Sequence, residues 1–123
     1  MSFTETKHAL RIEPLDTVAA SPEYLDAVEK HNHASKNLLA LLGRNPYLGS
    51  LFMETFIAEG AAFVDLLREG NEEAGVDKEK ELYELVAGEG VSKQEFFDFN
   101  SLFLTFKNTA VEYIARENEL AGK

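Results

Sequence analysis

The sequence predicts an all-α fold, an irregular antiparallel bundle of four helices preceded by an extended N-terminal arm. Apolar residues recur at spacings of three and four along most of the chain, and residues typical of helix starts precede these patterns. The connections between the patterns are short, which favours antiparallel neighbours. A chain of 123 residues has the usual size of one domain. We therefore expect a single helical domain over 21–123 and an extended or partly disordered arm over 1–20.

The first helix is expected over 22–42. Ser21 has the side chain of an N-cap, and Pro22 suits the first helical position, where no amide hydrogen bond is lost. The apolar stripe of this helix is polar in its middle, at His31. Gly43 is expected to end the helix in the left-handed conformation that glycine adopts without strain.

The second helix is expected over 46–69, because Pro46 restarts a helical pattern after a tight corner and Gly70 stops it. One apolar stripe of this helix is expected to face the core. A second apolar row lies on the adjacent flank, and such a broad apolar arc indicates burial from two sides. The members of this second row are candidate interface residues: Met53, Ile57, Gly60 and Val64.

The third helix is expected to be short, over 78–87, with Asp77 as its N-cap. The polar, glycine-containing segment 71–76 before it is interpreted as a surface loop. A helix of this length cannot be an equal member of the bundle, so the bundle is expected to be irregular.

The fourth helix, over 93–118, is expected to be the centre of the fold. Ser92 and Glu95 form the pattern of a capping box, in which each side chain binds the backbone amide of the other residue. A row of aromatic residues at helical spacing is expected to face the core. A second apolar row recurs every seven residues. It either belongs to the core as well or exceeds what the three neighbouring helices can cover, in which case it forms a dimer or partner interface. It supplies three further candidate interface residues: Phe97, Leu104 and Val111.

The charge and composition of the chain limit the classes of molecule that it can bind. Acidic residues outnumber basic ones by 22 to 12, which gives a formal net charge of −10. Lys and Arg side chains drive binding to nucleic acids and to anionic membranes, so neither is expected as a partner. The simplest interpretation of the acidic exterior is solubility. The more specific ones are binding to a basic protein partner and mimicry of the nucleic-acid backbone. The chain has no cysteine, no signal-peptide pattern and no apolar run long enough to cross a bilayer, so a cytoplasmic location is expected.

Two histidines, His31 and His33, lie two residues apart. Side chains at this spacing on a helix point to different faces and cannot chelate one metal ion. Glu29 and His33 have the i,i+4 spacing of a two-ligand site and are weak metal candidates. The simpler interpretation pairs His33 with Glu29 on the solvated face and gives His31 a hydrogen-bond partner at the edge of the core. No metal and no cofactor are expected.

Three polar residues are candidates for a polar site inside the core: His31, Glu59 and Asn100. Burial would raise the pKa of the Glu59 carboxyl and suit it for acid–base chemistry if the three side chains converged. The simpler alternative is that Glu59 emerges at the edge of its apolar stripe, or pairs with His31 or Lys107.

The apolar surface that the bundle does not cover is the feature that best indicates a function. We expect a non-enzymatic protein-interaction module of the adaptor, assembly or immunity/inhibitor type, which forms a homodimer through apolar faces of 46–69 and 93–118. Two alternatives remain open. One is a small-molecule-binding or enzymatic bundle that uses Glu59 and His31, and the other is an acidic DNA-mimic inhibitor.

Overall fold

The computed structural model describes residue 10 and residues 21–45 and 48–120. Within these residues it contains no strand and four α-helices: α2 (Pro22–Gly43), α3 (Ser50–Glu69), α4 (Glu72–Ala87) and α5 (Lys93–Leu120). The predicted all-α bundle of four helices is confirmed. None of the described helices is both long enough and apolar enough to cross a bilayer.

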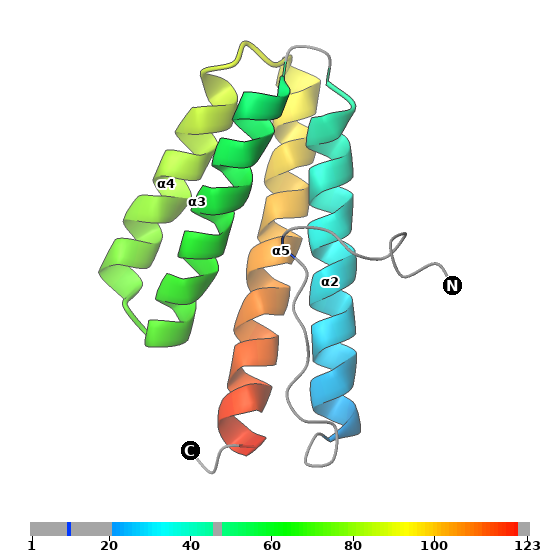
Figure 1. The fold of residues 1–123 in the computed structure, drawn as a ribbon, viewed down its shortest axis with the longest axis vertical. Coiled ribbons are helices and arrows are strands. Elements are labelled where there is room, and N and C mark those ends of the chain that lie inside the picture. The colour runs from blue at the N-terminus through cyan, green and yellow to red at the C-terminus, as the bar shows by residue number, and fades with distance from the viewer. Residues whose placement is uncertain (1–9, 11–20, 46–47, 121–123) are drawn as a thin grey trace.

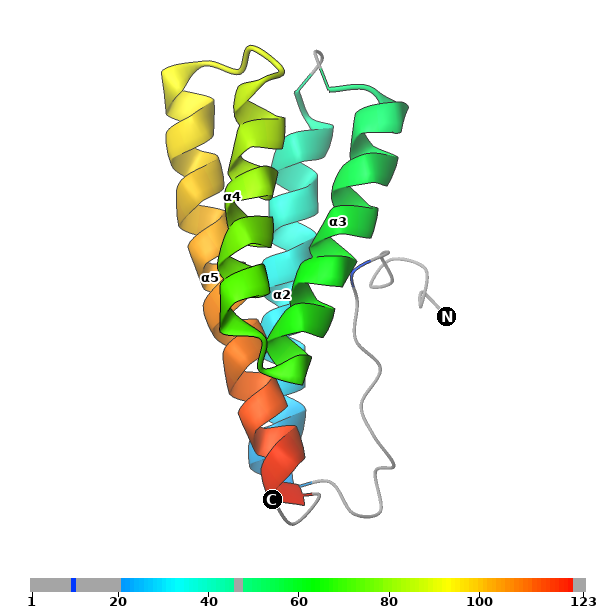
Figure 2. The ribbon, with the colours of Figure 1, turned by 90° about the vertical axis from the view of Figure 1, so that its left-hand side faces the viewer.

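The four helices form two pairs, and each helix runs opposite to the one before it (Figure 1). Helix α2 lies along α5, and α3 lies along α4. The shorter α3–α4 pair leaves the C-terminal end of α5 extending beyond it (Figure 2). Helix α5 contacts all three other helices, so it is the central helix of the fold.

The core is built around aromatic rings of α5. Phe99, Phe103 and Phe106 are at most 1% exposed, and the centroids of successive rings are 5.6 and 5.7 Å apart. Helix α3 contributes Phe56, whose ring meets Phe99 edge-on at 5.9 Å, and Phe63, whose centroid lies 5.5 Å from that of Phe103. Burying each ring is worth about 1.5–3 kcal/mol, so this one face of α5 supplies much of the stability of the fold.

The first corner differs from expectation in one conformation, which is wrong, and in one helix boundary. Gly43 is not left-handed, because it is the last residue of α2 and Arg44 follows it with helical dihedral angles (φ −83°, ψ −12°). Helix α3 begins at Ser50, four residues later than expected. The Asn45 carbonyl accepts a hydrogen bond from the Leu48 amide (3.1 Å), and this turn places the Leu48 side chain in the core before the helix starts.

The largest difference from expectation is the start of α4. The segment 71–76, expected to be a loop, contains the first turn of this helix, which begins at Glu72. The Asn71 side chain caps it by accepting a hydrogen bond from the Ala74 amide (3.2 Å), and the acids of the first turn complement the helix dipole. Asp77 is therefore an interior residue of the helix and not its N-cap.

The capping box predicted at the start of α5 is confirmed. Ser92 Oγ accepts a hydrogen bond from the Glu95 amide (3.1 Å), and Glu95 Oε1 accepts one from the Ser92 amide (3.0 Å). The other carboxylate oxygen of Glu95 accepts a hydrogen bond from Asn45 Nδ2 (2.8 Å). This bond ties the corner that follows α2 to the start of α5.

One residue of the expected N-terminal arm is described. Leu10 is 5% exposed and belongs to the core, where its side chain lies against Gly60 of α3. A Cβ atom added at Gly60 would stand 3.5 Å from Leu10 Cδ1, an ordinary contact distance, so Leu10 packs directly on the backbone of α3. The rest of the arm over 1–20 and the expected helix start at Pro46 lie outside the described residues.

Candidate functional site

Helix α5 exposes a row of large apolar side chains on the side opposite the core. Phe97 is 66% exposed, Leu104 50% and Val111 49%. Residues seven apart lie on nearly the same side of a helix. A shorter exposed side chain follows four residues after each large one. Figure 2 shows that α5 lies at the edge of the bundle. The six residues together are named the α5 outer face: Phe97, Ser101, Leu104, Asn108, Val111 and Ala115.

The α5 outer face is poor in negative charge for a chain this acidic. None of its six residues is acidic, although the chain carries 22 acidic residues, and the two acids of α5 between Lys93 and Val111, Glu95 and Asp98, are half-buried. Exposed acids occupy the other helices, for example Glu29 of α2, Asp65 of α3 and Glu84 of α4. Two acidic molecules can meet at such a strip with little charge repulsion.

The candidate interface row on α3 is not exposed in the way that the row on α5 is. Gly60 and Val64 are buried, and Met53 and Ile57 are half-buried against the core. These four residues therefore contribute to the fold itself. The large apolar side chain that α3 does expose is Leu51, which is 76% exposed in the first turn.

His31 is a polar residue of the core, between α2 and α5. It is 0% exposed, and its ring lies 5.0 Å from the ring of Phe106 and 5.1 Å from that of Tyr113. Nδ1 is 3.0 Å from Thr109 Oγ1, and Nε2 is 3.4 Å from Ser35 Oγ. The Thr109 hydroxyl donates its one proton to backbone carbonyls of α5 at 2.8 and 3.0 Å. The tautomer that satisfies all of these contacts carries its proton on Nδ1, which donates to Thr109 Oγ1, and accepts from Ser35 at Nε2.

The three polar candidates do not converge. His31 belongs to the contact between α2 and α5, whereas the Glu59 carboxylate pairs with the Lys78 ammonium between α3 and α4. Hydrogen bonding to Glu59 is the main reason that the pKa of Lys78 lies above its ordinary value. Asn100 is exposed, and its side-chain oxygen accepts a hydrogen bond from the Tyr83 hydroxyl (2.7 Å). The described residues thus do not bring these groups into one acid–base site.

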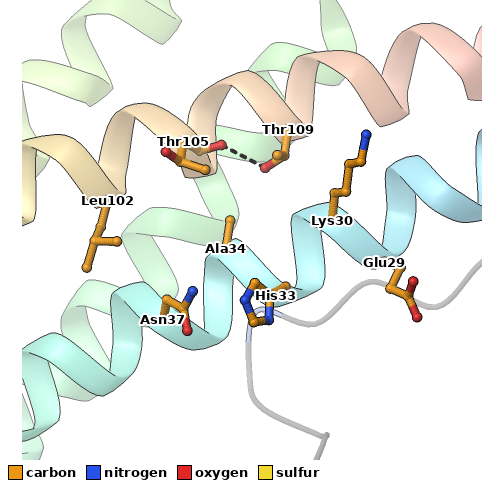
Figure 3. Close-up of a pocket in the computed structure, with 8 residues that line it drawn as sticks. All are labelled: Glu29, Lys30, His33, Ala34, Asn37, Leu102, Thr105 and Thr109. Atoms are coloured by element: carbon orange, nitrogen blue, oxygen red, sulfur yellow. Dashed lines mark hydrogen bonds between the residues drawn. The ribbon is translucent and has the colours of Figure 1, made fainter.

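The weak metal candidates Glu29 and His33 are both exposed and line an open groove of about 540 Å³ between α2 and α5. Figure 3 shows the residues of α2 along one wall and those of α5 along the other. The lining residues are Glu29, Lys30, His33, Ala34, Asn37, Leu102, Thr105 and Thr109. In the part of the chain that the structure describes, no three His, Cys, Asp or Glu side chains lie close enough together to hold a metal ion.

Two polar clusters that hold the helices together were not predicted. Arg68, near the end of α3, donates a hydrogen bond from Nη2 to the Tyr113 hydroxyl (2.8 Å) and pairs through Nη1 with Glu117. Lys107 of α5 pairs with Glu79 of α4 at 2.9 Å, where the sequence suggested Glu59 as its partner. The partners are 28 to 49 residues apart in the chain, so no local pattern could have shown them.

Burial raises the pKa of the Tyr113 phenol above its ordinary value, although the Arg68 guanidinium acts in the opposite direction. The fold therefore favours the protonated phenol, whose contribution to stability is complete below the unfolded pKa of about 10 and is lost as the pH rises through the raised folded value. We expect Tyr113→Phe to cost about 1 kcal/mol near neutral pH, through loss of the Arg68 hydrogen bond. The difference from the parent should shrink above about pH 10. Urea unfolding at several pH values measures this difference, and a gap that widens with pH would contradict the assignment.

Comparison with known proteins gives no match: no protein-family model, no curated protein and no solved structure matches this chain. Among the features above, the α5 outer face is the one whose side chains the fold itself does not use.

Proposed function

We propose that this chain is a non-enzymatic protein-interaction module that binds through the α5 outer face and forms a homodimer. One observation carries the proposal. Helix α5 fills the core with one side and exposes Phe97, Leu104 and Val111 on the other. An exposed apolar row of this kind, with shorter polar and small side chains between its members, is typical of a surface that another helix covers.

Burying this row against a second copy contributes a favourable free energy to association. Full burial of one such side chain is worth about 1.5–3 kcal/mol, and the three members of the row are each about half exposed or more. A symmetric dimer makes the same gain on both copies. Part of the gain is offset by the translational and rotational freedom lost on association, so we expect a dimer whose population depends on protein concentration.

Charge favours a second copy over a basic partner at this surface. The chain has a net charge of −10, yet none of the six residues of the α5 outer face offers a carboxylate to basic side chains. The same absence of acids lets two copies of an acidic chain approach each other here. A chain without cysteine needs no oxidising compartment to complete its fold, and we place the dimer in the cytoplasm.

Leu104→Glu tests the proposal, because it introduces a carboxylate into the middle of the α5 outer face. We expect sedimentation equilibrium to give the mass of two chains for the parent and of one chain for the variant. The helical circular dichroism spectrum should stay unchanged, because Leu104 is 50% exposed and outside the core.

Leu51→Glu is the matched control. Leu51 is 76% exposed and lies on α3, which packs on the opposite side of α5. The same substitution at this position should leave the dimer intact. A parent that sediments as one chain even in concentrated solution would sink the proposal, and so would a Leu51→Glu variant that dissociates as completely as Leu104→Glu.

A further inference from the structure

We infer that the two copies pack antiparallel along their α5 outer faces, so that each large side chain of one copy lies level with a short side chain of the other. The level pairs are Phe97 with Ala115, Leu104 with Asn108, and Val111 with Ser101. This arrangement rests on the proposed function, because it specifies the partner of the same surface and how that partner is oriented.

The order of side-chain sizes along α5 favours the antiparallel orientation. Each large residue of the α5 outer face is followed four residues later by a Ser, Asn or Ala. Two such helices that meet antiparallel can place each large side chain in the space beside a short one, as knobs fit into holes. In a parallel pair each residue meets its own copy, so the helices would be crowded at Phe97 and loosely packed at Ala115.

One antiparallel register uses all three large side chains. A shift of one heptad in one direction places Val111 level with Gln94, which is a long polar residue. A shift in the other direction carries Phe97 past Leu120, the last residue of α5. Either shift leaves only two of the three large residues level with a short one, so the inferred register buries the most apolar surface.

The distribution of charge along α5 supports the same orientation independently. The exposed residues from Lys93 to Val111 include no carboxylate, whereas the C-terminal part of the helix exposes Glu112 and Glu119. A parallel pair would bring these acids close to their own copies. The antiparallel pair sets the acidic end of one helix beside the half of the other in which the carboxylates, Glu95 and Asp98, are half-buried. It also brings Lys93 level with Glu119 of the second copy, which already pairs with Arg116 at 3.2 Å.

Engineered cysteines test the arrangement, because the chain has no cysteine of its own. Two variants are made separately, Ser101→Cys and Val111→Cys, and one of them carries a tag. A short bismaleimide is added to each variant alone and to an equal mixture of the two. In the inferred dimer the two copies of either cysteine are about 15 Å apart along the helices, so neither variant crosslinks to itself. Subunits of the mixture pair at random, so covalent dimer containing both variants should reach about half of the protein.

Crosslinking of each variant to itself would reveal a parallel pair and overturn the inference. Crosslinking of Ser101→Cys to Asn118→Cys in place of Val111→Cys would reveal a shift of one heptad and overturn it as well. Sedimentation of the same samples distinguishes failure of the antiparallel arrangement from failure of the proposed dimer. Dimers that crosslink in the wrong combination, or in none, contradict the arrangement alone, whereas single chains contradict the proposed function.

Discussion

Replacing Phe103 with Ala is expected to lower the free energy of unfolding by about 3–5 kcal/mol. The ring is 0% exposed, and its centroid lies 5.6 Å from that of Phe99, 5.7 Å from Phe106 and 5.5 Å from Phe63. Neighbours that are themselves packed at crystal-like density cannot close the cavity left by a whole ring. The loss is a large fraction of the roughly 5–15 kcal/mol that stabilises a typical domain.

Urea unfolding followed by circular dichroism measures this loss, and Phe97→Ala is the matched control. Phe97 is the same residue type on the same helix but is 66% exposed. In dilute protein, where the chain is monomeric, its replacement should change the free energy of unfolding by no more than about 0.5 kcal/mol. Similar losses for the two variants would contradict the assignment of one core face and one outer face to α5.

The second large effect is expected at His31. Leucine has a similar size to histidine, but His31→Leu removes the hydrogen bonds that Nδ1 makes to Thr109 and Nε2 to Ser35. The Ser35 hydroxyl, which is 0% exposed, then loses a buried hydrogen bond in surroundings closed to water, whereas Thr109 lines the open groove. Because an unsatisfied buried polar group costs about 1–3 kcal/mol, we expect a loss of stability in that range, measured by urea unfolding.

His33→Leu is the control, since His33 lies on the same helix and is exposed. It should change the stability by no more than about 0.5 kcal/mol. A double-mutant cycle between His31→Leu and Thr109→Val should give a coupling energy of about 1 kcal/mol, because the two residues share one hydrogen bond. Strict additivity in that cycle would mean that this bond does not hold α2 to α5.

The side of α5 that faces the core follows from the sequence, because a 3,4 spacing of apolar residues reports which side of a helix is buried. Phe99, Phe103 and Phe106 are buried as that spacing predicts. The row of seven-residue spacing was compatible with a place either in the core or at an interface. Only the positions of the other helices decide between the two, and they leave Phe97 and Leu104 exposed.

The start of α4 shows why some boundaries were not predictable. Asn71 and Asp77 are equally suitable N-cap residues by type. Asn71 is the one used, because Gly70 adopts the left-handed conformation (φ 75°) and turns the chain directly from α3 into α4. The earlier start also places Lys78 inside the helix, where it reaches Glu59 of α3. The partner of Glu59 could not be predicted without this boundary.

Helix α5 uses one face for its own core, and we propose that it uses the opposite face to bind a second copy. The midpoint temperature of thermal unfolding, measured over a wide range of protein concentration for the parent and for Leu104→Glu, tests both parts together. A partner that binds only the folded chain raises its stability by mass action. We therefore expect the midpoint of the parent to rise with concentration and to converge on dilution with that of Leu104→Glu, which should not vary. A parent midpoint independent of concentration would contradict the dimer, and a variant midpoint far below the parent's at every concentration would place Leu104 in the core.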